Sequence, residues 1–191
     1  MQFLCNLKTR YRRESSMKKL HNLTFILGGT SSGKSVYAEG IVISTDRPKT
    51  YIATAQAFDE EMKNKILAHI VQRGPGWVTV DAPLDPSSVL RGQDAADVVL
   101  LDCVTLWLTN VLLADRDIAA ACDELLDALA ACPCPVVVVS NEVGQGIVPD
   151  NALSRRFRSA QGQINRRLAA QADTVVAVMA GLPLALKGEL P

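Results

Sequence analysis

The chain lacks the sequence patterns that indicate a metal centre, a disulfide framework or a membrane span. Its five cysteines form no C-x-x-C pair, and only two histidines accompany them. This pattern predicts reduced structural thiols and no zinc site. The apolar run Pro135 to Val139 is far shorter than the roughly 20 residues of a transmembrane helix, and no other run approaches that length. We therefore expect no membrane span and a cytoplasmic location.

An excess of either charge is also lacking. Twenty basic and 20 acidic side chains give a formal net charge of zero at pH 7, so composition does not favour a nucleic-acid partner. Hydrophobic residues make up 48% of the chain, which argues against extensive disorder. With 191 residues, we expect one folded domain over residues 23–191. Residues 1–22 are expected to be a disordered extension, or to include a misassigned start, with Met17 as the true first residue.

The stretch Leu23 to Tyr37 carries the strongest functional signal. It joins an apolar strand, the pattern G-x-x-x-x-G-K-S and a helix start, which together predict a phosphate-binding loop (P-loop). The glycines let backbone N–H groups surround an anion at the positive end of the helix. Lys34 is expected to reach the β- and γ-phosphates, and the Ser35 hydroxyl to ligate Mg²⁺. The predicted nucleotide contacts are Gly28, Gly29, Thr30, Ser31, Ser32, Gly33, Lys34 and Ser35.

Strands and helices alternate after this loop. Further strands are predicted at residues 50–54, 77–81, 98–102, 136–139 and 174–179, and helices at 36–45, 59–73, 87–92, 106–113, 118–131 and 151–171. The residues after Gly181 are expected to form a short tail. This order predicts a three-layer α/β fold of the RecA-like P-loop NTPase type, with a mostly parallel sheet and the nucleotide at the C-terminal edges of its strands.

A second motif ends the strand at residues 98–102. Four apolar residues followed by Asp102 match the Walker-B pattern, in which the carboxylate holds Mg²⁺ with the loop serine. The alternative is an ordinary strand-end aspartate that caps the next turn. The P-loop upstream favours the metal-binding interpretation.

His69 lies in the helix predicted at residues 59–73, which Asp59 is expected to cap. Met62, Ile66 and Ile70 are spaced four apart and predict a buried stripe, with His69 at its border. Position alone leaves two interpretations open. The histidine is either a packed helix-border residue or a reachable nucleophile.

The helix predicted at residues 151–171 carries arginines without intervening acids. They are Arg155, Arg156, Arg158, Arg166 and Arg167. Such a face suits phosphate recognition or a subunit contact, and equally a solvated basic surface.

Five segments of the chain resemble, in order, the bifunctional adenosylcobinamide kinase and adenosylcobinamide-phosphate guanylyltransferases of cobalamin biosynthesis. The resemblance covers about residues 23–187. Its segments are LGGTSSGKSVYAE, YIATAQ, DEEMKNKI up to His69 and Arg73, LLDCVTLWLTN, and SNEVGQGIVPDN leading into RRFR and GQIN. A P-loop alone indicates only an NTPase, whereas five motifs in one order are far more specific.

The resemblance implies two reactions at one nucleotide site. First, ATP or GTP phosphorylates the aminopropanol hydroxyl of adenosylcobinamide. Second, GTP transfers GMP to the resulting adenosylcobinamide phosphate through a covalent guanylyl-histidine, and the matching residue here is His69. Lys34, Ser35 and Asp102 would supply the phosphate and Mg²⁺ contacts. The family also implies a homo-oligomer, perhaps a trimer.

Further nucleotide contacts follow from the same resemblance. They are Thr54, Ala55, Gln56, Arg73 and Asp81, and a carboxylate among them suits the donors of guanine. Two positions depart from the family pattern. Ser31 stands where relatives commonly have arginine, which puts nucleotide affinity or preference in doubt. Ala68 stands where some relatives have a second histidine, which leaves His69 as the nucleophile.

Two other functions remain open from the sequence. One is a P-loop small-molecule kinase in which His69 is structural and no covalent intermediate forms. The other is a RecA-like ATPase module that acts as a switch on a partner, and such a module should lack the segment from Asn141 to Pro149.

Overall fold

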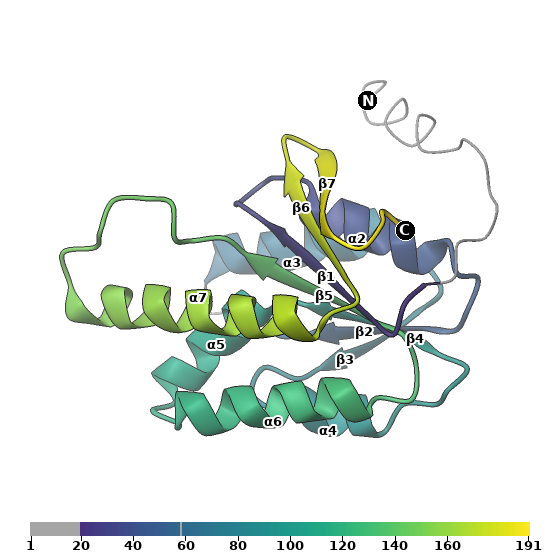
Figure 1. Ribbon diagram of the computed structural model, residues 1–191, viewed down its shortest axis with the longest axis horizontal. Coiled ribbons are helices and arrows are strands. Elements are labelled where there is room, and N and C mark those ends of the chain that lie inside the picture. Colours follow the sequence, from purple (N-terminus) through teal and green to yellow (C-terminus); the bar gives the residue numbers. More distant parts are fainter. Residues whose placement is uncertain (1–19, 58) are drawn as a thin grey trace.

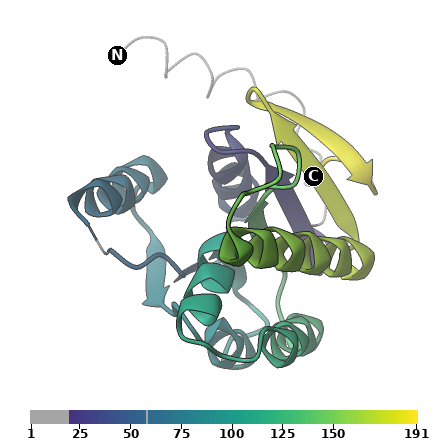
Figure 2. The same cartoon turned by 90° about the vertical axis from the view of Figure 1, so that its left-hand side faces the viewer.

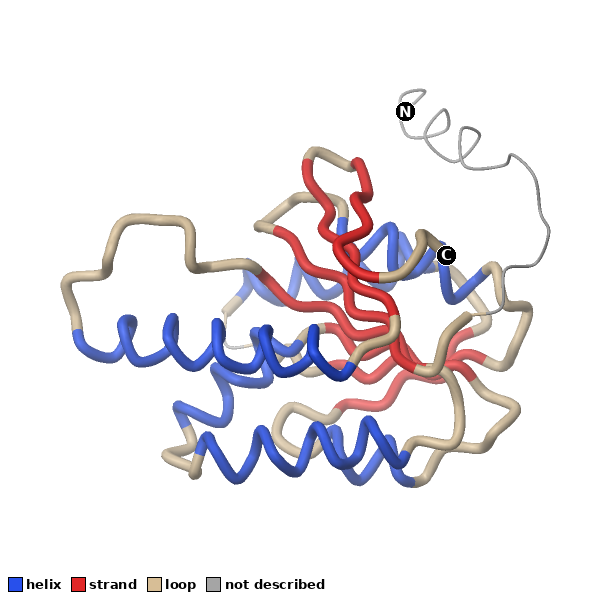
Figure 3. The backbone as a smooth tube through the Cα atoms, in the orientation of Figure 1, coloured by secondary structure: helices blue, strands red, loops and turns tan. Residues whose placement is uncertain are grey.

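The structure is a computed structural model, and it describes residues 20–57 and 59–191. A central sheet lies between layers of helices, as Figures 1 and 3 show. The strands are β1 (Leu23–Gly28), β2 (Lys49–Ala53), β3 (Trp77–Asp81), β4 (Val98–Asp102), β5 (Val136–Asn141), β6 (Thr174–Met179) and β7 (Leu182–Lys187). The helices are α2 (Lys34–Ile43), α3 (Glu60–Arg73), α4 (Pro86–Arg91), α5 (Val104–Leu113), α6 (Ile118–Ala131) and α7 (Ala152–Gln171).

The sheet has seven strands in the order β3-β2-β4-β5-β1-β6-β7. The first six are parallel, and only β7 pairs antiparallel, with β6. The C-terminal ends of the parallel strands therefore meet at one edge, where α/β sheets bind ligands. The predicted three-layer, mostly parallel α/β fold is confirmed.

Strand β5 lies at the centre of this sheet, between β4 and β1. Val136, Val137, Val138 and Val139 are fully buried, because helices cover both faces of the strand. α2 covers one face, while α4, α5, α6 and α7 pack on the other (Figure 2). A β-branched run of this kind is typical of a central parallel strand.

Helix α3 packs less closely than its sequence predicted. Asp59 caps it as expected, accepting a hydrogen bond of 2.7 Å from the backbone N of Met62. The expected buried stripe is wrong, however, because Met62 and Ile66 are only half-buried and Ile70 is 46% exposed. The helix lies over the β3 side of the sheet (Figure 2), outside both core clusters. Residues spaced four apart do share a face, but here that face borders a cavity.

The expected tail after Gly181 is also wrong, because residues 182–187 form the edge strand β7. A turn with positive φ at Ala180 and Gly181 reverses the chain, and Pro183 then lies opposite Val178. Proline has no N–H to donate and is tolerated only on edge strands such as this one. Leu182, Leu184 and Leu186 are all exposed.

The remaining predictions from composition concern cysteines, membranes and the N-terminus. The four cysteines in the described part of the chain are free. No helix among the described residues is long and apolar enough to cross a membrane. The extension predicted at residues 1–22 falls mostly outside the described residues, although Leu20 packs against the core on the α2 side.

Candidate nucleotide-binding site

The P-loop connects the end of β1 to the start of α2. Gly33 precedes the helix with a φ of 93°, in the left-handed region that favours glycine. Ser31 also has a positive φ, of 58°. The loop closes on itself through Gly29, whose carbonyl accepts hydrogen bonds from the Ser32 backbone N at 3.3 Å and from Lys34 Nζ at 3.3 Å. Lys34 therefore lies across the loop in which a phosphate would sit.

The P-loop also packs tightly against the β6–β7 hairpin. A Cβ atom on Gly28 would lie 2.5 Å from Ser32 Oγ and 2.6 Å from the Val178 carbonyl oxygen, so only glycine fits there. The Gly181 backbone N donates to the Ser32 carbonyl at 2.8 Å. The hairpin that the sequence did not predict thus supports the loop from behind.

Asp102 ends β4 and is only 8% exposed. Its Oδ2 accepts a hydrogen bond of 3.1 Å from the Tyr51 hydroxyl. Burial, followed by the nearby Asp102 charge, raises the pKa of Tyr51 well above its usual value, so the hydroxyl stays protonated and remains a donor. The Asp102 carboxylate is thereby held in a fixed orientation.

Asp102 and Ser35 line one cavity of about 560 Å³. A hydroxyl and a carboxylate are oxygen ligands of the kind Mg²⁺ prefers when substrate phosphates complete its coordination. No group of three or more His, Cys, Asp or Glu side chains that could hold a metal gathers at this site or anywhere else in the described part of the chain, so phosphate oxygens would have to supply further ligands. The donor set therefore fits a magnesium ion bound together with a nucleotide.

The same cavity brings the P-loop and α3 together. Lys34, Asp81 and His69 all face it, although they come from three separate elements. The other predicted contacts that line it are Thr30, Ser31, Gly33, Ser35, Ala55, Arg73 and Asp102. Met62, Ile66 and Ile70 form its apolar wall on the α3 side. His69 is therefore a cavity residue and not a packed helix-border histidine.

The side chains of Gln72 and Arg73 hold the C-terminal part of α3 near the P-loop helix and the sheet. Gln72 Nε2 donates to Glu39 Oε2 at 3.0 Å, which joins α3 to α2. Burial raises the pKa of Glu39, while the Gln72 hydrogen bond opposes that effect. Arg73 stacks over the Tyr51 ring at 3.7 Å and donates to Thr79 Oγ1 at 2.9 Å. These contacts fix one end of the helix that carries His69.

Five of the predicted nucleotide contacts do not line the cavity: Gly28, Gly29, Ser32, Thr54 and Gln56. The first three belong to the loop itself. Thr54 differs, because its hydroxyl is used within the fold. It donates to the Cys103 carbonyl at 2.8 Å and accepts from the Cys103 N–H at 2.8 Å. The Thr54 hydroxyl thus ties the end of β2 to the residue after Asp102, and its nucleotide contact stays a prediction.

Thr54→Val tests this structural role. The substitution keeps the shape but leaves the buried N–H of Cys103 without its partner, while the Cys103 carbonyl keeps the hydrogen bond from the Trp107 backbone N at 3.1 Å. We expect the free energy of unfolding to fall by about 1–3 kcal/mol, the cost of unsatisfied buried polar groups. Urea denaturation of the two proteins measures the difference. Unchanged stability would show that the Thr54 hydroxyl contributes nothing to the fold.

Arginines of α7 hold the loop between β5 and α7, residues 142–151, which extends from the end of β5 (Figure 3). Arg155 Nη1 donates to the carbonyls of Pro149 at 3.0 Å and Asp150 at 2.6 Å. Arg158 donates to the carbonyls of Ile147, at 2.9 Å, and Gly144. Two of the five arginines thus position backbone, a role that the sequence did not predict.

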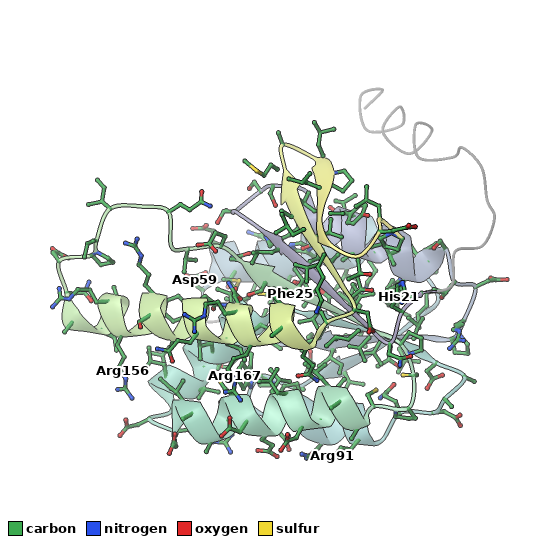
Figure 4. All side chains as sticks on the ribbon, viewed as in Figure 1. His21, Phe25, Asp59, Arg91, Arg156 and Arg167 are labelled. Atoms are coloured by element: carbon green, nitrogen blue, oxygen red, sulfur yellow. The ribbon has the colours of Figure 1, made fainter. Side chains whose placement is uncertain are left out.

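A second cavity, of about 730 Å³, lies between α6 and α7. Arg156 and Arg167 line it, and Figure 4 shows both pointing from α7 toward α6. Arg167 pairs with Asp123 at 2.6 Å. No residue of the P-loop and none of the residues expected to hold metal or guanine lies there, so the smaller cavity is the candidate site.

The sequence missed several residues of the candidate site. Tyr51, Thr79, Leu106 and Asn141 line the cavity and were not expected to. Asn141 carried a usable signal, because it is a polar residue at the end of a buried parallel strand, as Asp102 is. Tyr51 carried none, since its side chain position depends on how β2 pairs with β4.

Comparison with known proteins identifies a family and its relatives. The model of the CobU family, described as cobinamide kinase / cobinamide phosphate guanyltransferase, matches residues 24–186. The bifunctional adenosylcobalamin biosynthesis protein CobP of Pseudomonas aeruginosa is 41% identical over 167 residues, covering 86% of this chain and 96% of the relative. CobU of Salmonella typhimurium is 37% identical over 182 residues, which cover 86% of this chain and 99% of that relative.

Solved structures share the fold at low sequence identity. A Pyrococcus horikoshii OT3 protein, project PH0250, gives a TM-score of 0.55 at 8% identity, over 95% of this chain and 92% of that chain. An ATPase from a bacterial type III secretion system gives a TM-score of 0.50 at 12% identity, over 87% of this chain and 57% of that chain. These likenesses support the P-loop ATPase fold alone. Because the family model matches residues 24–186, the chain belongs to the cobinamide kinase / cobinamide phosphate guanyltransferase family.

Proposed function

We propose that this protein carries out both family reactions at one nucleotide site. It phosphorylates the aminopropanol hydroxyl of adenosylcobinamide with ATP or GTP, and then transfers GMP from GTP to the product to give adenosylcobinamide-GDP. The observation that carries the proposal is the single cavity that Lys34, Asp102 and His69 line together. A kinase alone needs the first two residues, whereas guanylyl transfer also needs the third.

The kinase step depends on positioning and on charge stabilisation. The P-loop amides and Lys34 would hold the triphosphate, and Ser35 and Asp102 would hold Mg²⁺, which would supply positive charge to offset that of the phosphates. Tyr51 keeps the Asp102 carboxylate oriented. The buried setting of this carboxylate strengthens its electrostatic contacts, because water screens them less.

In the guanylyl step His69 would be the nucleophile. An imidazole nitrogen attacks the α-phosphorus of GTP, the bond to the bridging oxygen breaks, and pyrophosphate leaves with the electron pair. The phosphate of adenosylcobinamide phosphate then attacks the same phosphorus and displaces the histidine. Asp81 and Arg73 would contact the guanosine part, and their position in the lining of the cavity supports this. A carboxylate suits the two donors of guanine N1 and N2.

Three further features belong to the proposal. Mg²⁺ acts with GTP or ATP, the protein works in the cytoplasm, and it assembles as a homo-oligomer such as a trimer. The oxygen donors of Ser35 and Asp102 in one cavity support the first of these features. Residues 23–191 would form the single catalytic domain, consistent with the one sheet that runs through them.

A coupled assay tests the proposed function directly. Purified protein is incubated with adenosylcobinamide, Mg²⁺ and GTP, and both corrinoid products are followed by chromatography. We expect adenosylcobinamide phosphate to appear first and adenosylcobinamide-GDP to follow, with release of pyrophosphate. A protein that stops at the phosphate, with no covalent GMP, would be a P-loop kinase only. Nucleotide hydrolysis without any corrinoid product would indicate an ATPase module.

A further inference from the structure

Glu39 is a buried carboxylate on α2, the helix that begins at the P-loop. It is only 4% exposed. Its Oε2 accepts the 3.0 Å hydrogen bond from Gln72 Nε2, while its Oε1 has no hydrogen-bond partner in the described part of the chain. An ionised carboxylate only accepts hydrogen bonds, so the partner that Oε1 lacks is an N–H or O–H donor. Leaving such a buried atom unpaired costs about 1–3 kcal/mol, which favours any state of the protein that supplies the donor.

The contact with Gln72 brings this carboxylate to the part of α3 that carries His69. Gln72 lies three residues after His69 on the helix. Residues three apart on a helix share a face, with their Cβ atoms about 5–6 Å apart. Both side chains line the cavity, which agrees with a shared face. Glu39 therefore lies beside the turn of α3 from which the His69 imidazole projects.

The charges around Glu39 agree with this placement. Burial raises the pKa of its carboxyl, and the nearby Asp102 charge adds to the effect. The Gln72 hydrogen bond and the positive charges of His69 and Arg73 act on this pKa in the opposite direction. His69 is thus close enough for its charge to act on the Glu39 carboxylate, and its ring N–H is a donor of the kind that Oε1 lacks.

Arg73 is the other cation of α3 near Glu39, but its guanidinium is already held. It stacks over the Tyr51 ring at 3.7 Å and donates to Thr79 Oγ1 at 2.9 Å. Movement toward Glu39 would break both contacts. His69 is exposed at the cavity, and an exposed side chain changes rotamer within nanoseconds. Of the two, the imidazole is therefore the donor that can turn to Oε1 without loss elsewhere.

We propose that Glu39 is a positioning residue for guanylyl transfer, in which its Oε1 accepts a hydrogen bond from one ring N–H of His69. This inference rests on the proposed function, because it concerns the nucleophile of the second reaction. A neutral imidazole has one N–H and one nitrogen with a lone pair, and only the latter attacks phosphorus. A carboxylate that accepts from the N–H fixes both the tautomer and the ring orientation. Glu39 thus keeps the lone pair on the nitrogen that faces the triphosphate.

The carboxylate also stabilises charge that develops on the ring. The lone pair of His69 forms a bond to the α-phosphorus of GTP, the bond to the α–β bridging oxygen breaks, and pyrophosphate leaves with the electron pair. The ring proton stays in place, so the ring becomes positively charged next to Glu39. When the phosphate of adenosylcobinamide phosphate attacks, the electron pair returns to the imidazole, which leaves neutral. Phosphoryl transfer to the aminopropanol hydroxyl uses no histidine, so Glu39 matters little for it.

Glu39→Gln tests the inference, with Glu189→Gln as the matched control. An amide offers one acceptor and one donor in place of two acceptors, so the variant cannot accept from both Gln72 and His69. We expect the initial rate of covalent GMP labelling of His69 to fall roughly 10- to 100-fold, as when partners that orient a reactive side chain are lost. The kinase rate should stay near the wild-type value, which also shows that the variant is folded. Glu189 is exposed and follows β7, so Glu189→Gln should match wild type in both reactions.

The tautomer of His69 gives a second readout, which a purely structural role of Glu39 would not change. The chain has two histidines, so in a His21→Ala background His69 is the only one. Protein labelled with ¹⁵N-histidine is mixed with Mg²⁺ and the α,β-methylene analogue of GTP, whose bridging carbon prevents loss of pyrophosphate. The ring ¹⁵N shifts should report a single tautomer when Glu39 is present and a loss of that preference in Glu39→Gln.

The outcomes separate the inference from the proposed function. Wild-type labelling in a folded Glu39→Gln protein would overturn the inference, and so would slow labelling with an unchanged His69 tautomer. Parallel loss of both reactions would assign Glu39 to the general structure of the site, which also contradicts it. A wild-type protein that forms no covalent GMP would overturn the proposed function instead, and the tautomer would then still decide whether His69 and Glu39 are hydrogen-bonded.

Discussion

His69→Ala is expected to abolish covalent attachment of GMP while adenosylcobinamide phosphate still forms. Of the described residues that line the cavity, His69 is the only histidine, and the alanine variant removes the proposed nucleophile while it leaves the P-loop and Asp102 in place. GTP labelled at the α-phosphate, followed by denaturing electrophoresis, measures the adduct. A phosphoramidate predicts label that is lost in acid and stable in alkali, and no label above background is expected in the variant.

His21→Ala is the matched control for this experiment. His21 is the other histidine of the chain, it is exposed, and Figure 4 shows it on the far side of the molecule from Asp59, which caps the helix of His69. This variant should keep full labelling. Label that persists in His69→Ala would place the nucleophile elsewhere. Loss of the kinase product as well would mean that the substitution damages the site as a whole.

Lys34→Ala is expected to affect both reactions. Lys34 lies across the P-loop with its Nζ 3.3 Å from the Gly29 carbonyl, and among the side chains that the structure describes it is the one lysine that lines the cavity. Without it, the charge on the β- and γ-phosphates is not neutralised in either reaction. We expect the kinase rate to fall on the order of 100-fold or more. Labelling of His69 should fall too, because pyrophosphate is its leaving group. Steady-state kinetics and the α-phosphate label measure the two effects.

Lys63→Ala controls for the loss of a positive charge. Lys63 lies on the same helix as His69, but it is exposed and pairs with Glu60 at 2.5 Å. An exposed pair of this kind contributes about 1 kcal/mol or less. This variant should keep both activities. Wild-type rates in Lys34→Ala would contradict the assignment of the P-loop as the triphosphate site.

Local patterns sufficed where the chemistry lies in consecutive residues. The P-loop needs a strand, a glycine-rich turn and a helix in direct succession, and all three are visible between Leu23 and Ile43. Asp102 follows a run of four buried apolar residues, so its place at the C-terminal edge of a parallel sheet was also predictable. The cap at Asp59 is likewise a local hydrogen bond.

Other features depend on which segments become neighbours. The spacing of Met62, Ile66 and Ile70 places them on one face of α3, but the spacing does not say whether a core or a cavity covers that face. Pro183 looks like the end of ordered structure, yet an edge strand tolerates it. Thr54 looks like a site residue until its bonds to Cys103 are seen.

The sequence by itself determined the phosphate loop, the acidic strand end and the family, because each is carried by residues close together in the chain. The tertiary structure decided that His69 faces the same cavity as Lys34, and that Asn141 stands between the P-loop and Asp102. The order of the strands in the sheet explains why the sequence alone did not show these neighbours. The insertion of β5 between β1 and β4 joins residues more than 100 positions apart, and no local pattern encodes which strand pairs with which.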